Sequence, residues 1–93
     1  IWEFAEVGLE EKQSSALLMQ ILRDAGFQVE TGLGGMPTAF VATCGSGQPV
    51  IALLAEYDAL PALSQKVSPE EDPVEAGRPG HGCGHSGLAA GSL

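Results

Sequence analysis

Basic residues are scarce in this chain of 93 residues. Four lysines and arginines stand against twelve aspartates and glutamates, which gives a formal net charge of −8. Binding to nucleic acids requires a basic surface that neutralises phosphates, and a chain this acidic does not offer one. The same charge disfavours attraction to anionic membranes. We therefore expect neither nucleic-acid nor membrane partners.

Long apolar runs and cysteines are scarce as well. No run approaches the roughly 20 residues of a membrane-spanning helix, and the chain shows no signal-peptide pattern. Only Cys44 and Cys83 are present, too few for the disulfide framework of a small secreted domain. The two could pair, but the free thiols of a cytosolic chain fit equally well. We expect a cytoplasmic protein.

The remaining composition is that of a small folded unit. Hydrophobic residues make up 44% of the chain and charged residues 17%, which allows a modest core and argues against disorder. The chain begins in a pattern typical of the tail of a helix and stops inside a second helical pattern. We therefore expect residues 1–93 to be one piece of a longer protein.

The order of elements indicates an α/β fold. Apolar residues recur at helical spacing over residues 10–25, with Glu10 and Glu11 expected in the first turn. Residues 27–30 and 38–43 alternate like short strands. The run PVIALLA at residues 49–55 is typical of a central strand buried on both faces. A polar loop over residues 62–80 and a helix over 87–93, capped by Ser86, complete the prediction.

Two segments contain the candidate chemistry. In GHGCGH, at residues 80–85, single glycines separate His81, Cys83 and His85, so an extended segment would present all three on one face. Imidazole and thiolate are ligands for zinc and related metals. Glu56 and Asp58 follow the apolar run, and such carboxylates can ligate a metal or orient a ligating imidazole. The alternatives without a functional site are a flexible glycine loop for residues 80–85 and, for the second segment, a turn that Asp58 caps.

Together these segments resemble the co-catalytic zinc peptidase and amidohydrolase family. The resemblance rests on LAEYDALP at residues 54–61, followed by GHGCGH at residues 80–85. The family includes aminoacylases, carboxypeptidase G and hydrolases of indole-acetyl-amino acids. IWEFAEVG at residues 1–8, GMPTAFVA at 35–42 and LPALSQ at 60–65 are similar to its p-aminobenzoyl-glutamate hydrolase branch.

The resemblance implies a fold and an activity. Residues 1–93 would be the amino-terminal part of a metal-binding catalytic domain with a helix-covered mixed sheet, without the family's lid and dimerisation domain. The parent protein would hydrolyse the amide bond of small N-acyl- or N-aroyl-amino acids with zinc or manganese, two ions being expected in the complete site. We expect a homo-oligomer for the full-length protein, and no activity for this fragment alone.

The resemblance also implies roles for individual residues. Cys83 and His85 match metal ligands, and Asp58 matches the aspartate that supports the catalytic site. The roles of Glu56, where other branches have a ligating histidine, and of His81, which matches a position beside the metal, are open. Ser86 stands where the family commonly has Asp or Asn.

Two other functions remain open from the sequence. The chain could be a non-catalytic remnant that binds a metal or a partner, because the family's general base and further ligands are not in it. A redox module built on Cys44 and Cys83 is a third hypothesis. For any of these, a fragment whose central strand lacks sheet neighbours should aggregate or be marginally folded.

Overall fold

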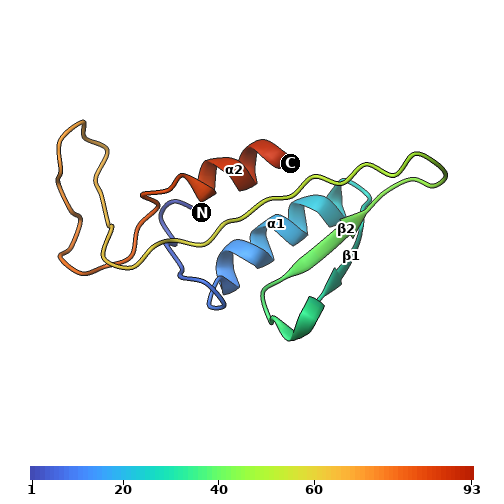
Figure 1. Ribbon diagram of the computed structural model, residues 1–93, viewed down its shortest axis with the longest axis horizontal. Coiled ribbons are helices and arrows are strands. Elements are labelled where there is room, and N and C mark those ends of the chain that lie inside the picture. The colour runs from blue at the N-terminus through green and yellow to red at the C-terminus, as the bar shows by residue number, and fades with distance from the viewer.

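The computed structural model describes residues 1–93 as a small α/β unit with two helices and one two-stranded sheet. Helix α1 (Lys12–Asp24) is followed by strand β1 (Gln28–Thr31), a short 3-10 turn η1 (Leu33–Gly35) and strand β2 (Phe40–Thr43). Helix α2 (His85–Ser92) ends the chain. Figure 1 shows α1 beside the hairpin formed by β1 and β2, and a long extended segment that leads from β2 toward the loop before α2.

The hairpin and α1 confirm the local predictions. Strands β1 and β2 pair antiparallel, from Gln28 opposite Thr43 to Thr31 opposite Phe40. Gly26 follows α1 with φ of +91°, a left-handed conformation that suits glycine at the end of a helix. Helix α1 begins later than predicted, at Lys12, so Glu10 and Glu11 precede its first turn.

The side chain of Glu6 substitutes for a local cap at the start of α1. Its carboxylate accepts hydrogen bonds from the backbone N–H of Gln13 at 2.9 Å and of Ser14 at 2.8 Å, and from the Ser14 hydroxyl at 2.9 Å. These N–H groups have no partner inside the helix, and the positive end of the helix dipole favours an anion there. Burial raises the pKa of Glu6, but the bonds from Gln13 and Ser14 outweigh it and lower the pKa below its usual value.

The prediction of a buried central strand at residues 49–55 is wrong in this chain. The segment is extended, but it belongs to no sheet and makes no backbone hydrogen bond. Ile51 is 83% exposed and Leu54 is 90% exposed. A strand with apolar side chains on both faces needs neighbours on both edges and cover on both faces, and the two-stranded sheet supplies neither. The expected mixed, helix-covered sheet is therefore not formed.

The core is correspondingly small. Leu18, Ala59 and Ala89 are the buried apolar residues, and Ile21 on the apolar face of α1 stays 43% exposed. Cys44 at the end of the hairpin is exposed. The expected first helix is reduced to a single turn, in which the Ala5 N–H bonds the Ile1 carbonyl. Neither helix has the length and apolar character that crossing a membrane requires.

Candidate metal centre

The carboxyl end of the extended segment is fixed by contacts with two other parts of the chain. The backbone N–H of Ala59 donates to the Glu6 carbonyl at 2.7 Å, and a parallel bridge joins Ala59 to Val7. The Tyr57 hydroxyl donates to the Thr38 carbonyl. Because side chains alternate along an extended chain, anchoring Tyr57 on one side leaves Glu56 and Asp58 to project toward the other.

This anchor changes the chemistry of Tyr57 and was not predicted. Burial and, secondarily, the negative charge of Glu11 raise the pKa of the phenol to about 12. Glu11 in turn accepts a hydrogen bond from the Thr38 hydroxyl at 2.5 Å. The sequence contained one signal for this anchor. Tyr57 stands between Glu56 and Asp58, and the alternation of side chains along an extended segment places its ring on the side opposite the two carboxylates.

The start of α2 supplies the third functional side chain. Gly84 precedes the helix with φ of +82°, a conformation that glycine adopts without strain, and His85 is the first helical residue. The expected cap, Ser86, lies inside the first turn instead. The loop that leads to α2 is closed by two backbone hydrogen bonds between Leu60 and Gly80. A β-carbon on Gly80 would overlap the Leu63 carbonyl, so this position requires glycine.

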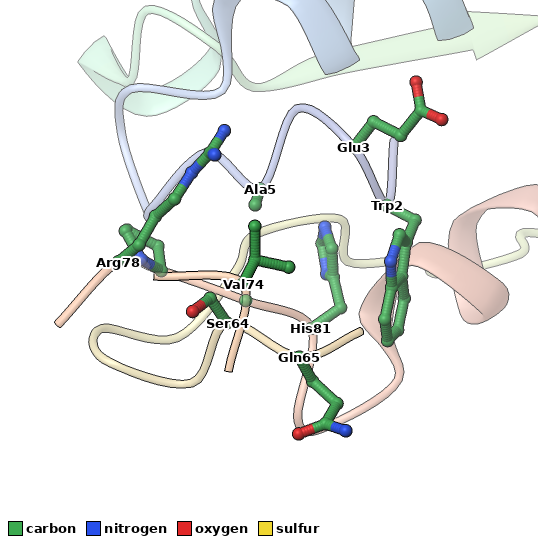
Figure 2. Close-up of a pocket in the computed structure, with 10 residues that line it drawn as sticks. Trp2, Glu3, Ala5, Ser64, Gln65, Val74, Arg78 and His81 are labelled. Atoms are coloured by element: carbon green, nitrogen blue, oxygen red, sulfur yellow. The ribbon is translucent and has the colours of Figure 1, made fainter. Parts of the chain in front are cut away.

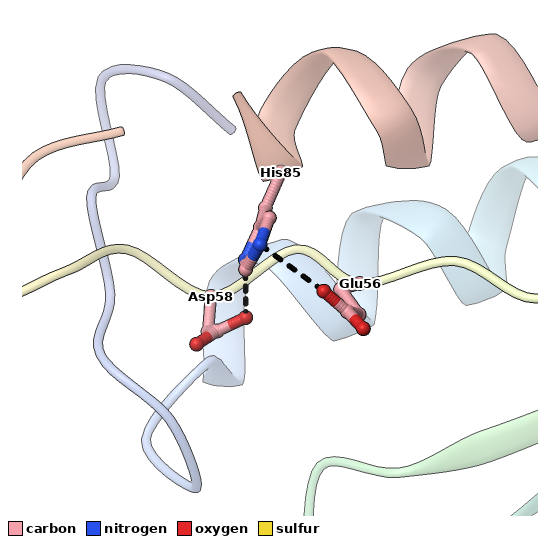
Figure 3. A group of neighbouring side chains, drawn as sticks. All are labelled: Glu56, Asp58 and His85. Carbon is pink, nitrogen blue, oxygen red and sulfur yellow. Dashed lines mark hydrogen bonds and ion pairs between the residues drawn. The ribbon is translucent and has the colours of Figure 1, made fainter. Parts of the chain in front are cut away.

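Glu56, Asp58 and His85 meet as one cluster (Figure 3). Nδ1 of His85 lies 2.7 Å from Oδ1 of Asp58, and Nε2 lies 3.1 Å from Oε2 of Glu56. The potential ligand atoms of the three residues all lie within 4.8 Å of one another. The hydrogen bond to Asp58 and the charges of both carboxylates outweigh burial and raise the pKa of His85. Figure 3 shows the imidazole of α2 reaching toward the two carboxylates on the extended segment.

The donor set of this cluster fits a divalent transition metal. One imidazole nitrogen and carboxylate oxygens are ligands that zinc and its neighbours accept. A carboxylate on the second ring nitrogen of a ligating histidine is the usual support for such a ligand. The structure thus brings together Asp58 and His85, two of the three predicted site residues, and adds Glu56.

Cys83 and His81 lie outside this cluster. The segment before α2 is not extended, because the N–H of Gly84 bonds the carbonyl of His81 and closes a turn. The expectation that His81, Cys83 and His85 share one face is therefore wrong here. Cys83 is exposed with a free thiol, and His81 is buried at 5% exposure.

His81 instead lines a separate hollow of about 280 Å³ (Figure 2). Its Nε2 lies 3.2 Å from the carbonyl oxygen of Ile1, its ring packs beside Trp2, and its Nδ1 has no partner. Burial, as the main cause, lowers the pKa of this imidazole. Val74 and Arg78 line the same hollow. Glu56, Asp58 and His85 do not line it.

Comparison with known proteins finds that nearly the whole chain is similar to parts of proteins named as hydrolases. It is 47% identical over 87 residues to a subunit of the p-aminobenzoyl-glutamate hydrolase of Escherichia coli, a match that covers 92% of this chain and 18% of that protein. It is 34% identical over 87 residues to thermostable carboxypeptidase 1 of Saccharolobus solfataricus, covering 91% and 21% of the two chains. Putative amidohydrolase YhaA of Bacillus subtilis is 29% identical over 92 residues, with 97% and 22% covered.

These matches confirm the resemblance seen in the two motifs, although no family model and no solved structure matches the chain. The chain spans about a fifth of the length of these curated relatives. Over that span the chain is homologous to these amidohydrolases and carboxypeptidases.

Proposed function

We propose that this chain is part of a metal-dependent amidohydrolase that cleaves the amide bond of small N-acyl- or N-aroyl-amino acids. The observation that supports this most strongly is the contact between Asp58 and His85, at 2.7 Å, across 27 residues of sequence. Both residues come from the motifs on which the family resemblance rests, and the relatives are hydrolases of amide bonds by name.

The residues of this chain would hold a divalent cation, zinc or manganese. The resemblance implies Cys83 and His85 as its ligands, whereas the structure has Glu56 and not Cys83 beside His85. Bound in such a site, a cation of this kind lowers the pKa of a water molecule and polarises an amide carbonyl. Asp58 would accept a hydrogen bond from the Nδ1–H of His85, which fixes the ring orientation and leaves Nε2, the nitrogen that faces Glu56, as the one that can bind a cation. The complete site is expected to hold two ions.

The proton acceptor for hydrolysis is not supplied by this cluster. Both of its carboxylates already contact His85, and a general base must be free to take a proton from the attacking water. The rest of a full-length protein would have to provide the base, so the 93-residue chain alone should be inactive. The resemblance also implies a homo-oligomeric full-length protein, and the cysteine usage of the sequence favours a cytoplasmic one.

A chimera tests this proposal. Residues 1–93 would replace the matching segment of the E. coli relative, and the release of amino acid from N-aroyl- and N-acyl-amino acids would be measured with added zinc or manganese. We expect activity, a loss of about 10–100-fold with Asp58→Asn, a larger loss with His85→Ala, and no change with Glu30→Gln, an exposed carboxylate on β1. Full activity with Cys83→Ala would reject the role of that thiolate.

The second candidate is a metal-binding chain without catalytic activity. The engagement of both carboxylates by His85 favours it, since a cluster without a free base can bind an ion but cannot activate water. A folded chimera that binds metal and hydrolyses none of these substrates would support this alternative.

A further inference from the structure

A hollow of about 280 Å³ lies apart from the cluster of Glu56, Asp58 and His85 (Figure 2). Its walls come from the amino-terminal segment, from residues 64–65 and from the stretch between residues 74 and 81. The volume lies just below the range of about 300–1,000 Å³ that pockets for drug-sized molecules occupy. The hollow is therefore large enough for a small molecule, such as one aromatic ring with a short substituent.

Hydrogen bonds between the three segments hold these walls in place. The backbone N–H of Ser64 donates to the carbonyl of Arg78 at 2.9 Å, and the Ser64 hydroxyl donates to the carbonyl of Glu75 at 2.6 Å. Nε2 of His81 donates to the carbonyl of Ile1 at 3.2 Å, because a carbonyl oxygen can only accept. The walls are thus already positioned, which reduces the ordering that binding of a ligand would require.

The indole of Trp2 forms one end of the hollow. Trp2 is 45% exposed, and its ring centroid lies 6.2 Å from that of His81, with 30° between the ring planes. Aromatic rings pack against one another at centroid separations of about 4.5–7 Å. The indole therefore offers a free aromatic surface on which the ring of a ligand can pack, with Val74 as an apolar wall beside it.

Arg78 lies at the opposite end and has no partner for its charge. Lys12 and Lys66 each form an ion pair with a nearby carboxylate, whereas the guanidinium of Arg78 makes no ion pair and no hydrogen bond. A planar guanidinium matches a carboxylate with two parallel hydrogen bonds. The one acidic residue that lines the hollow, Glu3, directs its carboxylate away from His81 (Figure 2). The hollow thus presents an unpaired cation to an anionic ligand.

The acceptor on His81 determines which way round such a ligand binds. With Nε2 carrying the proton, Nδ1 of the neutral ring holds a lone pair, and this atom is buried without a hydrogen-bond partner. A lone pair repels a carboxylate. The carboxylate therefore belongs at Arg78 and the aromatic ring at Trp2, and Figure 2 shows Val74 and His81 between these two residues.

We propose that this hollow binds a small aromatic carboxylate, with the carboxylate paired to Arg78 and the ring packed against Trp2 and Val74. Both parts of the ligand are needed, because an anion without an apolar body gains only one exposed ion pair, which contributes little. The inference does not depend on the proposed function, since no residue of the metal-binding cluster lines the hollow.

Trp2 is the only tryptophan of the chain, so its fluorescence reports binding at the hollow directly. Benzoate would be titrated into the 93-residue chain at constant ionic strength. We expect a saturable change in tryptophan emission, with a Kd on the order of 1 mM. Arg78→Gln should weaken binding at least about tenfold. Arg23→Gln, which removes an exposed arginine in the last turn of α1, should bind benzoate like the parent chain.

Two analogues separate the contributions of the charge and the ring. Benzamide keeps the ring without the charge, and acetate keeps the charge without the ring, so each should bind at least about tenfold more weakly than benzoate. The far-ultraviolet circular dichroism of each variant reports whether α1 is intact. Arg78 is exposed in the loop, so its replacement leaves the core undisturbed.

Three results would overturn the inference. One is tryptophan emission that changes only linearly with benzoate concentration, as collisional quenching produces. Another is unchanged benzoate affinity in Arg78→Gln. The third is binding of benzamide or acetate as tight as that of benzoate. An active chimera together with any of these results would reject the inference and leave the proposed function standing.

Discussion

Replacing Glu6 tests whether a residue outside the helix holds the start of α1 in place. Its carboxylate accepts two backbone N–H groups, from Gln13 and Ser14, and the Ser14 hydroxyl. Hydrogen bonds to a charged group contribute about 1.5–3 kcal/mol each, and loss of a helix cap costs about 0.5–2 kcal/mol. The bonds share one acceptor and solvent screens a partly exposed carboxylate. We therefore expect Glu6→Ala to lower the free energy of unfolding by about 2 kcal/mol.

The pH dependence of this effect has a definite sign. The pKa of Glu6 in the folded chain lies below its ordinary value of 4.5. The stabilisation is therefore fully present above pH 4.5 and is lost as the pH falls through the lower pKa of the folded state. Glu6→Gln should be less stable than the parent chain at pH 7, and the two should converge in strong acid.

Urea unfolding followed by helical circular dichroism, at pH 7 and at a series of acidic values, provides the measurement. Glu71→Gln is the matched control, because this exposed glutamate in the loop makes no side-chain hydrogen bond or ion pair. A Glu6 variant as stable as the control at pH 7, or a difference that does not shrink in acid, would refute the capping role.

Three further outcomes follow from the structure. Ile51→Lys with Leu53→Lys should reduce self-association of the chain at least about tenfold in sedimentation, since both side chains are exposed and apolar, whereas Val67→Lys in the loop should not. Absorbance titration should place the Tyr57 phenol at a pKa of about 12. The stabilisation that the neutral phenol gives to the folded chain should then be lost as the pH rises from 10 toward that value. In Tyr57→Phe this alkaline loss of stability should be absent. Gly80→Ala should cost about 2–3 kcal/mol in thermal unfolding because its β-carbon meets the Leu63 carbonyl, while Gly87→Ala in α2, with open space around it, should not destabilise the chain.

The sequence predicted what local forces determine. The helical spacing before Gly26 and the alternation around Phe40 correspond to α1 and β2, because amphipathic periodicity is a property of a few successive residues. Residues 49–55 are extended as expected, but the prediction that they pair within a sheet and are buried there was wrong. Burial of a strand depends on distant neighbours, which the local pattern of an apolar run does not identify.

The site shows the same division between local and distant information. Alternation suggested that His81, Cys83 and His85 share a face, and a single left-handed residue, Gly84, redirects the chain into a turn and a helix. The approach of His85 to Asp58 was indicated by family resemblance and not by spacing. The contact of Glu56 with Nε2 depends on the orientation of one ring and could not be read from composition or periodicity.

The two reciprocal hydrogen bonds between Leu60 and Gly80, at 2.9 Å and 3.0 Å, have an evolutionary consequence. They close residues 61–79 at their base, and Asp58 and His85 both lie outside the closure. Doubling the length of a loop costs only about 0.6 kcal/mol of closure entropy. Insertions and deletions in this loop can therefore accumulate between related proteins while the distance between the two functional side chains stays fixed. The loop is a place where lineages can diverge in sequence and length without rebuilding the cluster.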